Sequence, residues 1–109
     1  MIVYEQDWLI TQTKHFQPLY TDIHLGHQWL TSMGEGAEKL NITLQYCMSL
    51  PRHILTALEI PRITHTRGSS DYAVHLGGKR DQWNIGISSM LVDAISLAPF
   101  KDVFWSTSS

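Results

Sequence analysis

Residues 42–67 read ITLQYCMSLPRHILTALEIPRITHTR, and this stretch decides the fold class. It opens with Ile42–Tyr46, whose β-branched and aromatic side chains favour a strand. Pro51 is suited to the first turn of a helix, where its missing N–H costs nothing, and Pro61 is predicted to close that helix. Ile63–Arg67 then predicts a second strand. A strand, a helix and another strand in succession favour a parallel sheet with right-handed crossovers.

The sequence before this stretch extends the alternation. Ile2–Tyr4 is a short apolar run suited to a buried strand. Residues 10–24 are polar and mixed, without a clear period, which predicts a long loop. Apolar residues from 27 to 40 fall on one helical face and predict a helix. Gly34 and Gly36 weaken that helix by roughly 1 kcal/mol each relative to alanine.

The sequence after this stretch continues the same order. Residues 68–82 are rich in glycine, serine and charged side chains and predict a loop. Apolar residues repeat at helical spacing from 85 to 98, and Pro99 is predicted to stop this helix. Residues 102–105 are predicted to form a fourth strand. With 109 residues, the chain is expected to be a single domain with an α/β fold built from parallel β/α repeats.

The composition narrows the class of protein. A hydrophobic content of 43% and a charged content of 17% are typical of a globular domain. The formal net charge of -2 gives no reason to expect a nucleic-acid partner, which would favour a basic patch. No apolar run approaches the ~20 residues of a membrane-spanning helix, so no membrane partner is expected. The N-terminus shows no recognisable signal peptide, and the compartment stays open.

The sequence carries no motif for a cofactor. Cys47 is the single cysteine, which excludes an internal disulfide and a cysteine-rich metal site. The histidines form no convincing helical pair of metal ligands. No Gly-x-Gly-x-x-Gly motif follows a predicted strand, so a dinucleotide site is not expected. We therefore expect neither a metal nor another cofactor.

Three chemically useful side chains follow the first three predicted strands. Asp7, Cys47 and Asp71 each lie just after one of these strands. Because active sites of parallel α/β folds collect at the carboxyl ends of the strands, we expect the three to share one edge of the sheet.

The segments around these residues resemble a known family. They read Tyr4-Glu5-Gln6-Asp7-Trp8, Tyr46-Cys47-Met48 and Arg67-Gly68-Ser69-Ser70-Asp71-Tyr72. In order and spacing, over roughly residues 2–72, they resemble consecutive strand ends in the α-galactosidase clan of glycoside hydrolases, which includes raffinose-synthase-like enzymes. The matching features are an aromatic-x-x-Asp-Trp segment, a cysteine after the next strand and an Arg-x-x-x-Asp pattern.

The resemblance implies a retaining α-glycosidase that acts on a carbohydrate substrate without a cofactor. Asp7 would be the nucleophile that forms a covalent glycosyl-enzyme, and Asp71 would be the general acid/base. Such enzymes hold the two carboxyl groups about 5–5.5 Å apart, on opposite sides of the scissile bond. The residues that the resemblance places against the substrate are Trp8, Cys47, Arg67 and Tyr72.

The resemblance also implies a partial barrel. An eight-stranded TIM barrel takes about 200–250 residues, so this chain would supply only its fourth to seventh strands, roughly half a TIM barrel. The chain is therefore expected to be a fragment of a larger catalytic domain. Its open sheet edges, at Ile2–Tyr4 and at residues 103–105, are expected to pair with the missing half of the barrel or with each other.

Two other readings stay open. An aspartate after a strand is often a cap of a turn or helix, so the chain could be a non-catalytic α/β binding or scaffold module. It could also be an inactive glycosidase remnant that keeps the fold with an incomplete pocket. The sugar, the aglycone and the choice between hydrolysis and sugar transfer are not determined by the sequence.

Overall fold

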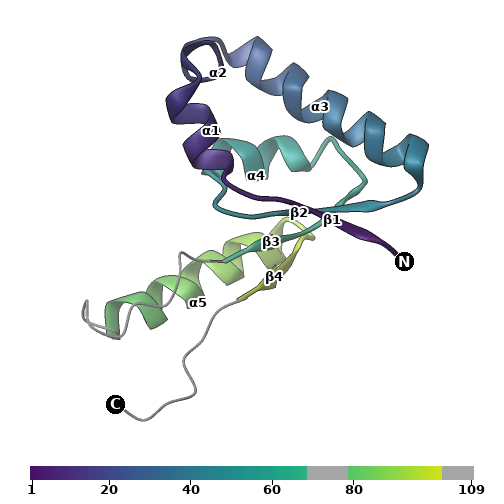
Figure 1. Cartoon of the computed structure of the whole chain (residues 1–109). Coiled ribbons are helices and arrows are strands. Elements are labelled where there is room, and N and C mark those ends of the chain that lie inside the picture. Colours follow the sequence, from purple (N-terminus) through teal and green to yellow (C-terminus); the bar gives the residue numbers. More distant parts are fainter. Residues whose placement is uncertain (69–78, 102–109) are drawn as a thin grey trace.

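The computed structural model describes residues 1–68 and 79–101, and it shows an α/β fold with a four-stranded, all-parallel sheet in the order β1-β2-β3-β4 (Figure 1). The elements in chain order are β1 (Val3–Gln6), α1 (Leu9–His15), α2 (Gln17–Thr21), α3 (Ile23–Leu40), β2 (Thr43–Tyr46), α4 (Pro51–Ala57), β3 (Ile63–Arg67), α5 (Lys79–Ala94) and β4 (Ala98–Phe100). The predicted parallel sheet and the alternation of strands with helices are confirmed. No helix in the described part of the chain is both long and apolar enough to cross a membrane.

The prediction of a long loop over residues 10–24 was wrong, because α1, α2 and the start of α3 occupy it. Helix α1 buries only Leu9 and Thr13, which are one turn apart, and so shows almost no apolar periodicity. Helix α3 begins four residues before the predicted start. There the Asp22 carboxylate accepts hydrogen bonds from the backbone N–H groups of His24 and Leu25, which caps the helix.

The C-terminal elements also differ from their predicted bounds. Helix α5 starts at Lys79, inside the predicted loop over residues 68–82, and ends at Ala94 instead of residue 98. Ser96 then has a φ of 63°, a left-handed conformation that does not continue a helix. Residues Ala98–Phe100 form the fourth strand. The prediction that the helix runs to residue 98 and is stopped by Pro99 was therefore wrong. The predicted strand over residues 102–105 lies outside the described residues.

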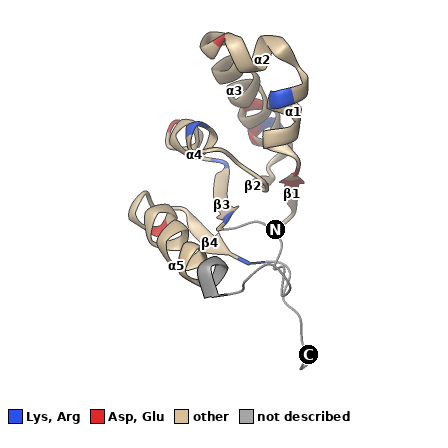
Figure 2. Ribbon diagram, turned by 90° about the vertical axis from the view of Figure 1, so that its left-hand side faces the viewer, with Lys and Arg blue, Asp and Glu red and all other residues tan. Residues whose placement is uncertain are grey.

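The hydrophobic core lies between the sheet and helices α3, α4 and α5, which flank one side of the strands (Figure 2). In β2, the alternate residues Leu44 and Tyr46 are buried in this core, and Ile63 of β3 joins them. Consecutive order with right-handed crossovers places every connecting helix on the same face of a parallel sheet. The other face carries the side chains that alternate with the core positions, among them Glu5 and Gln45.

Gly34 marks the closest approach of α3 to the loop that precedes β3. A Cβ atom at Gly34 would lie 2.3 Å from Cγ2 of Ile60, whereas a Cβ at Gly36 would meet nothing within 4 Å. We expect Gly34→Ala to lower the free energy of unfolding by about 1–3 kcal/mol through overpacking, which exceeds its gain in helix propensity. Gly36→Ala is the matched control and should raise it by up to about 1 kcal/mol. Urea denaturation measures both, and equal effects of the two substitutions would contradict this account of the packing.

Strand β3 contains a register shift that changes which face its side chains occupy. Leu44 pairs with Ile63, but the next residue, Gln45, pairs with His65. Thr64 is thus an extra residue of the bulge type on β3. Ile63 and Arg67 are four positions apart and would share a face in a regular strand. The shift lets Ile63 pack in the core while Arg67 lies on the opposite face with Cys47.

His53 of α4 is a buried polar group that joins α4 to α1. Its ring is 1% exposed; Nδ1 accepts a hydrogen bond from the backbone N–H of Leu50 (3.0 Å), and Nε2 lies 3.1 Å from Oγ1 of Thr13. Because Nδ1 is the acceptor, the proton of the neutral ring is on Nε2, which donates to Thr13. Burial, assisted by the nearby charge of Arg52, lowers the pKa of His53 to about 4.

Candidate active site at the carboxyl ends of the strands

The structure brings Asp7, Cys47 and Arg67 together at the carboxyl ends of β1, β2 and β3. Gln6 pairs with Tyr46, and Tyr46 pairs with Thr66, so the residues that follow these pairs are neighbours across the sheet. The backbone N–H of Cys47 donates to the carbonyl of Gln6 (3.0 Å), which continues the ladder one residue past the two strands. Two of the three residues that were expected to share this edge, Asp7 and Cys47, therefore lie side by side. Arg67 lies next to Cys47.

Cys47 connects the other two side chains. Its Sγ accepts a hydrogen bond from Nη1 of Arg67 (3.2 Å), and its side chain is 1% exposed. Burial, the largest cause, and a hydrogen bond to Asp7 raise the pKa of the thiol to about 12, against a smaller lowering effect of Arg67. The thiol is thus protonated at neutral pH, so it can donate to the Asp7 carboxylate while accepting from the guanidinium.

The thiol of Cys47 is expected to be chemically inert in the native protein. A pKa of about 12, compared with the ordinary value of 9.0, reduces the thiolate fraction by about 10³-fold. Iodoacetamide should therefore alkylate Cys47 at least that much more slowly in the folded chain than in urea, where burial is lost. Mass spectrometry over time measures the rate, and fast alkylation of the folded chain would contradict the burial of this thiol.

Glu5 belongs to the same cluster, and the sequence analysis did not identify it as a site residue. Carboxylate oxygens of Glu5 and Asp7 and the Sγ of Cys47 lie within 4.8 Å of one another. Glu5 precedes Asp7 by two positions in an extended segment, so both side chains lie on one face. That spacing was the signal in the sequence that could have found it.

The donor set of Glu5, Asp7 and Cys47 could in principle hold a metal ion, but its surroundings oppose a cation. A thiol binds metals as thiolate, whereas the thiol of Cys47 has a raised pKa. The guanidinium of Arg67 lies in contact with the same sulfur and repels a cation there. Cys47 and Arg67 are almost fully buried, so the atoms of the cluster that a ligand can reach are mainly the carboxylate oxygens of Glu5 and Asp7.

The backbone after Asp7 and after Cys47 is held in an unusual conformation. Trp8 has a φ of 62° and Met48 a φ of 51°, which is the left-handed region that large side chains rarely adopt. The N–H of Trp8 donates to Oδ1 of Asp7 (2.7 Å), and the N–H of Ile10 donates to the carbonyl of Met48 (2.8 Å). The second bond ties the first turn of α1 to the segment that follows β2. Such outliers cluster at functional sites, where the surrounding structure holds them.

The remaining predicted site residues are only partly placed. Trp8 lies beside Asp7 and is 55% exposed, so its indole is available to a ligand. Asp71 and Tyr72 lie outside the described residues, and the separation of Asp7 from Asp71 is not defined. Next to the cluster, a cavity of about 360 Å³ lies between α4, α5 and the ends of β2 and β3. Residues that line it include Met48, Ser49, Arg67, Gly68 and Ser88.

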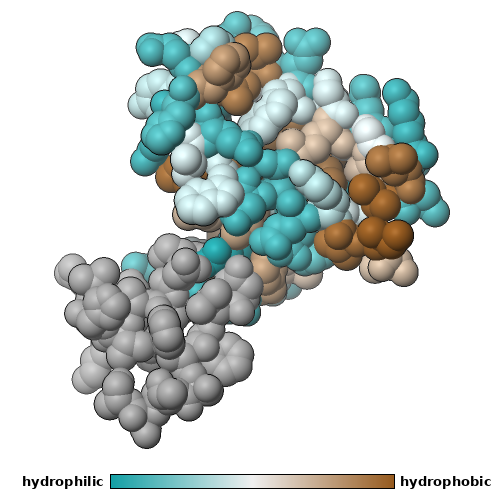
Figure 3. All heavy atoms as spheres, viewed as in Figure 1, coloured by the Kyte–Doolittle hydropathy of each residue, from teal (hydrophilic) through white to brown (hydrophobic). Residues whose placement is uncertain are grey.

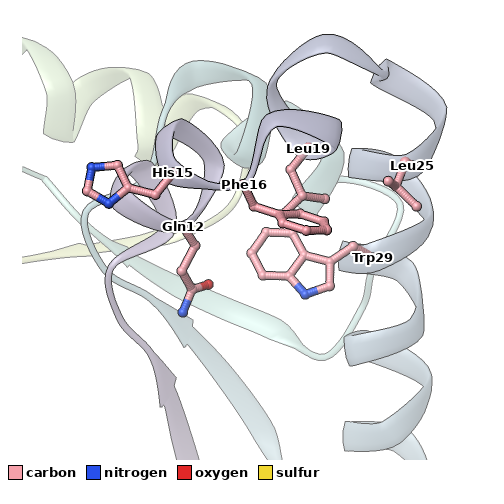
Figure 4. A pocket seen from close by; sticks show the side chains of 6 residues that line it. All are labelled: Gln12, His15, Phe16, Leu19, Leu25 and Trp29. Carbon is pink, nitrogen blue, oxygen red and sulfur yellow. The ribbon is translucent and has the colours of Figure 1, made fainter.

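A second cavity lies away from the strand ends, among α1, α2 and α3. It has a volume of about 560 Å³ and is open to solvent on one side. Its lining residues are Gln12, His15, Phe16, Leu19, Leu25 and Trp29 (Figure 4). No residue that the sequence analysis singled out lies in this cavity.

Comparisons of the chain with models of protein families, with curated proteins and with solved structures found no match.

Proposed function

We propose that this chain is part of a retaining α-glycosidase of the α-galactosidase type, with Asp7 as nucleophile and Asp71 as general acid/base. The observation that carries the proposal is the contiguous group of Asp7, Cys47 and Arg67 at the carboxyl ends of three adjacent parallel strands. Active sites of parallel α/β folds lie at this edge. The group also offers the acceptors and donors that sugar hydroxyls require.

The strand order supports the proposed partial TIM barrel. Four parallel strands in sequential order, with their connecting helices on one face, are what half of a (β/α)₈ barrel requires. The opposite face would then line the barrel interior, and Glu5, Gln45, His65 and Arg67 lie on it. Polar interior side chains near the carboxyl ends of the strands are where a barrel enzyme places its site.

The proposed reaction has two steps. The Asp7 carboxylate forms a bond to the anomeric carbon while the bond to the leaving oxygen breaks, and that oxygen takes the proton of Asp71. Water then attacks the same carbon and gives a proton to Asp71, and the bond to Asp7 breaks. In the described part of the site, the thiol of Cys47 and the N–H of Trp8 orient the Asp7 carboxylate. Arg67 donates a hydrogen bond to the sulfur of the same thiol.

One observation favours the non-catalytic alternative. The hydrogen bond from the N–H of Trp8 to Oδ1 of Asp7 precedes α1, which begins at Leu9, so the carboxylate also stabilises this turn. A turn role and a nucleophilic role differ in their chemistry, because only a nucleophile becomes covalently glycosylated.

Trapping with an activated fluorosugar of the α-galactosyl type tests the proposal. The sugar should add one glycosyl mass to the peptide that contains Asp7, and peptide sequencing by mass spectrometry identifies the residue. An adduct on Glu5, which lies in the same cluster, would overturn the assignment of the nucleophile. The absence of any adduct on the folded chain would favour the non-catalytic module or the inactive remnant.

A further inference from the structure

Helix α1 directly follows Asp7 and Trp8, and it is too short to be stable by itself. It has seven residues, whereas an isolated helix needs about 12–15 residues to form in water. Its buried side chains are those of Leu9 and Thr13, and Figure 3 shows mainly hydrophilic and intermediate residues where α1 lies. Contacts with the rest of the chain therefore have to hold this helix in place.

Within the described residues, two hydrogen bonds connect α1 to residues 48–53, which follow β2. The N–H of Ile10 donates to the carbonyl of Met48 (2.8 Å), and Nε2 of His53 donates to the hydroxyl of Thr13 (3.1 Å). Ile10 and Thr13 are three residues apart, so they lie on the same side of the helix, about one turn from each other. A single contact would leave α1 free to pivot, whereas two contacts at different heights fix both its position and its rotation.

The contact between Thr13 and His53 is closed to solvent. Thr13 is 0% and His53 is 1% exposed, and Nδ1 of His53 already accepts from the N–H of Leu50. Without the Thr13 hydroxyl, the N–H at Nε2 would be a buried donor with no acceptor among the described residues. Such a donor costs more than a bond lost at the surface, because water does not replace the missing partner. Loss of the hydroxyl therefore favours movement of α1 away from α4, which lets water reach the ring.

The two hydrogen bonds also hold the backbone beside Asp7 and Cys47. Trp8 and Met48 directly follow these two residues, and both have the left-handed conformation described above. This conformation is unfavourable for large side chains and persists only where the surrounding structure holds it. Helix α1 begins at the residue after Trp8, and Met48 itself accepts one of the two hydrogen bonds. Contacts of α1 with residues 48–53 therefore hold both unfavourable turns.

We propose that Thr13 and His53 are positioning residues of the candidate site. Their hydrogen bond holds α1 on α4, α1 fixes the turn at Trp8, and this turn keeps the Asp7 carboxylate beside the thiol of Cys47. Both residues are buried, so they act through α1 and not by contact with a ligand.

Alkylation of Cys47 by iodoacetamide in the folded chain is the primary measurement. The thiol is 1% exposed and reacts only when the structure around it opens. Thr13→Val keeps the shape of the side chain but cannot accept from His53, so it should raise the alkylation rate by about tenfold or more. The amide of Ile10 should also exchange faster. The amides of β2 and β3 should stay protected, which shows that the variant is folded.

Thr56→Val is the matched control. The Thr56 hydroxyl donates to the carbonyl of Arg52, one turn earlier in the same helix (2.9 Å), so the variant loses a similar bond that does not reach α1. It should leave the alkylation of Cys47 unchanged. An unchanged rate in Thr13→Val, or equal rates in Thr13→Val and Thr56→Val, would overturn the positioning role.

A second pair of variants decides the question if valine at position 13 does not fold. Thr13→Ser and Thr13→Ala lose the same methyl group, and only serine keeps the hydroxyl that accepts from His53. Thr13→Ser should react close to the wild-type rate, whereas Thr13→Ala should react about tenfold faster or more. Equal rates in the serine and alanine variants would contradict the proposal.

A further measurement rests on the proposed glycosidase function. Displacement of the Asp7 carboxylate should slow its labelling by the activated fluorosugar in Thr13→Val, and Thr13→Ser should restore the labelling. Labelling of Thr13→Val at the wild-type rate would overturn the positioning role. Absence of labelling in the wild-type chain would instead overturn the glycosidase function, and the alkylation of Cys47 would still decide the role of Thr13 and His53.

Discussion

Under the proposed glycosidase function, replacing Asp7 by asparagine is expected to abolish hydrolysis of aryl α-galactosides, with a loss in kcat on the order of 10³-fold or more. Asparagine keeps the shape of the side chain but cannot form the covalent glycosyl-enzyme. Its amide oxygen can still accept from the N–H of Trp8, the bond that Oδ1 of Asp7 makes at 2.7 Å. The variant should therefore fold normally, and the loss should appear in steady-state release of the aryl alcohol.

Glu5→Gln is the control that separates the two carboxylates of the cluster. Glu5 and Asp7 have oxygens within 4.8 Å of each other, so both variants remove one negative charge from almost the same place. If Asp7 is the nucleophile, Glu5→Gln should cost far less activity than Asp7→Asn. The reverse order of the two losses would transfer the nucleophilic role to Glu5. Equal, small losses would mean that the cluster acts only through its charge.

Acidification is expected to destabilise the fold through His53. The pKa of His53 falls from its ordinary value of 6.5 to about 4 in the folded chain. Between these values the unfolded chain binds a proton that the folded chain excludes, so stability is unaffected above about pH 6.5 and falls as the pH drops towards 4. At about 1.4 kcal/mol per pH unit, the full loss is roughly 3 kcal/mol. Urea denaturation across this range measures it.

His53→Gln isolates this contribution from the other histidines. Glutamine does not titrate, so the free energy of unfolding of the variant should vary less with pH, by roughly the same 3 kcal/mol over that range. The other histidines, among them His27 beside the Glu59 carboxylate, are unchanged in the variant. If the two proteins lost stability in parallel on acidification, another group would be responsible.

The sequence predicted those parts of the fold where one signal dominates. Ile63–Arg67 was predicted at its observed bounds, because a β-branched run follows a proline and a short helix. Helices α1 and α2 were missed because tertiary contacts, not apolar periodicity, hold them. Thr13 of α1, for example, is fully buried through its contact with His53, and no local pattern marks it as a core residue.

The sequence predicted where the candidate site lies, but it did not predict all the residues that form it. Strand ends could be read from the sequence, which was enough to place Asp7 beside Cys47. The spacing of two residues between Glu5 and Asp7 indicates a shared face, but the closeness of Glu5 to Cys47 depends on the pairing of β1 with β2, which no local pattern encodes. Asp71 and Tyr72 lie outside the described residues, so their placement stays a prediction.

The extra residue at Thr64 determines which mutations in β3 affect the core and which affect the opposite face of the sheet. Before it, β3 supplies Ile63 to the core; after it, β3 supplies His65 and Arg67 to the opposite face of the sheet. A mutation at position 63 therefore changes the packing of the core, whereas a mutation at position 65 or 67 changes the opposite face. Loss of the single extra residue at 64 would leave Ile63 and Arg67 three positions apart, which keeps them on opposite faces of a regular strand. We therefore expect a deletion at 64 to remove the bulge and to leave the two faces of β3 unchanged.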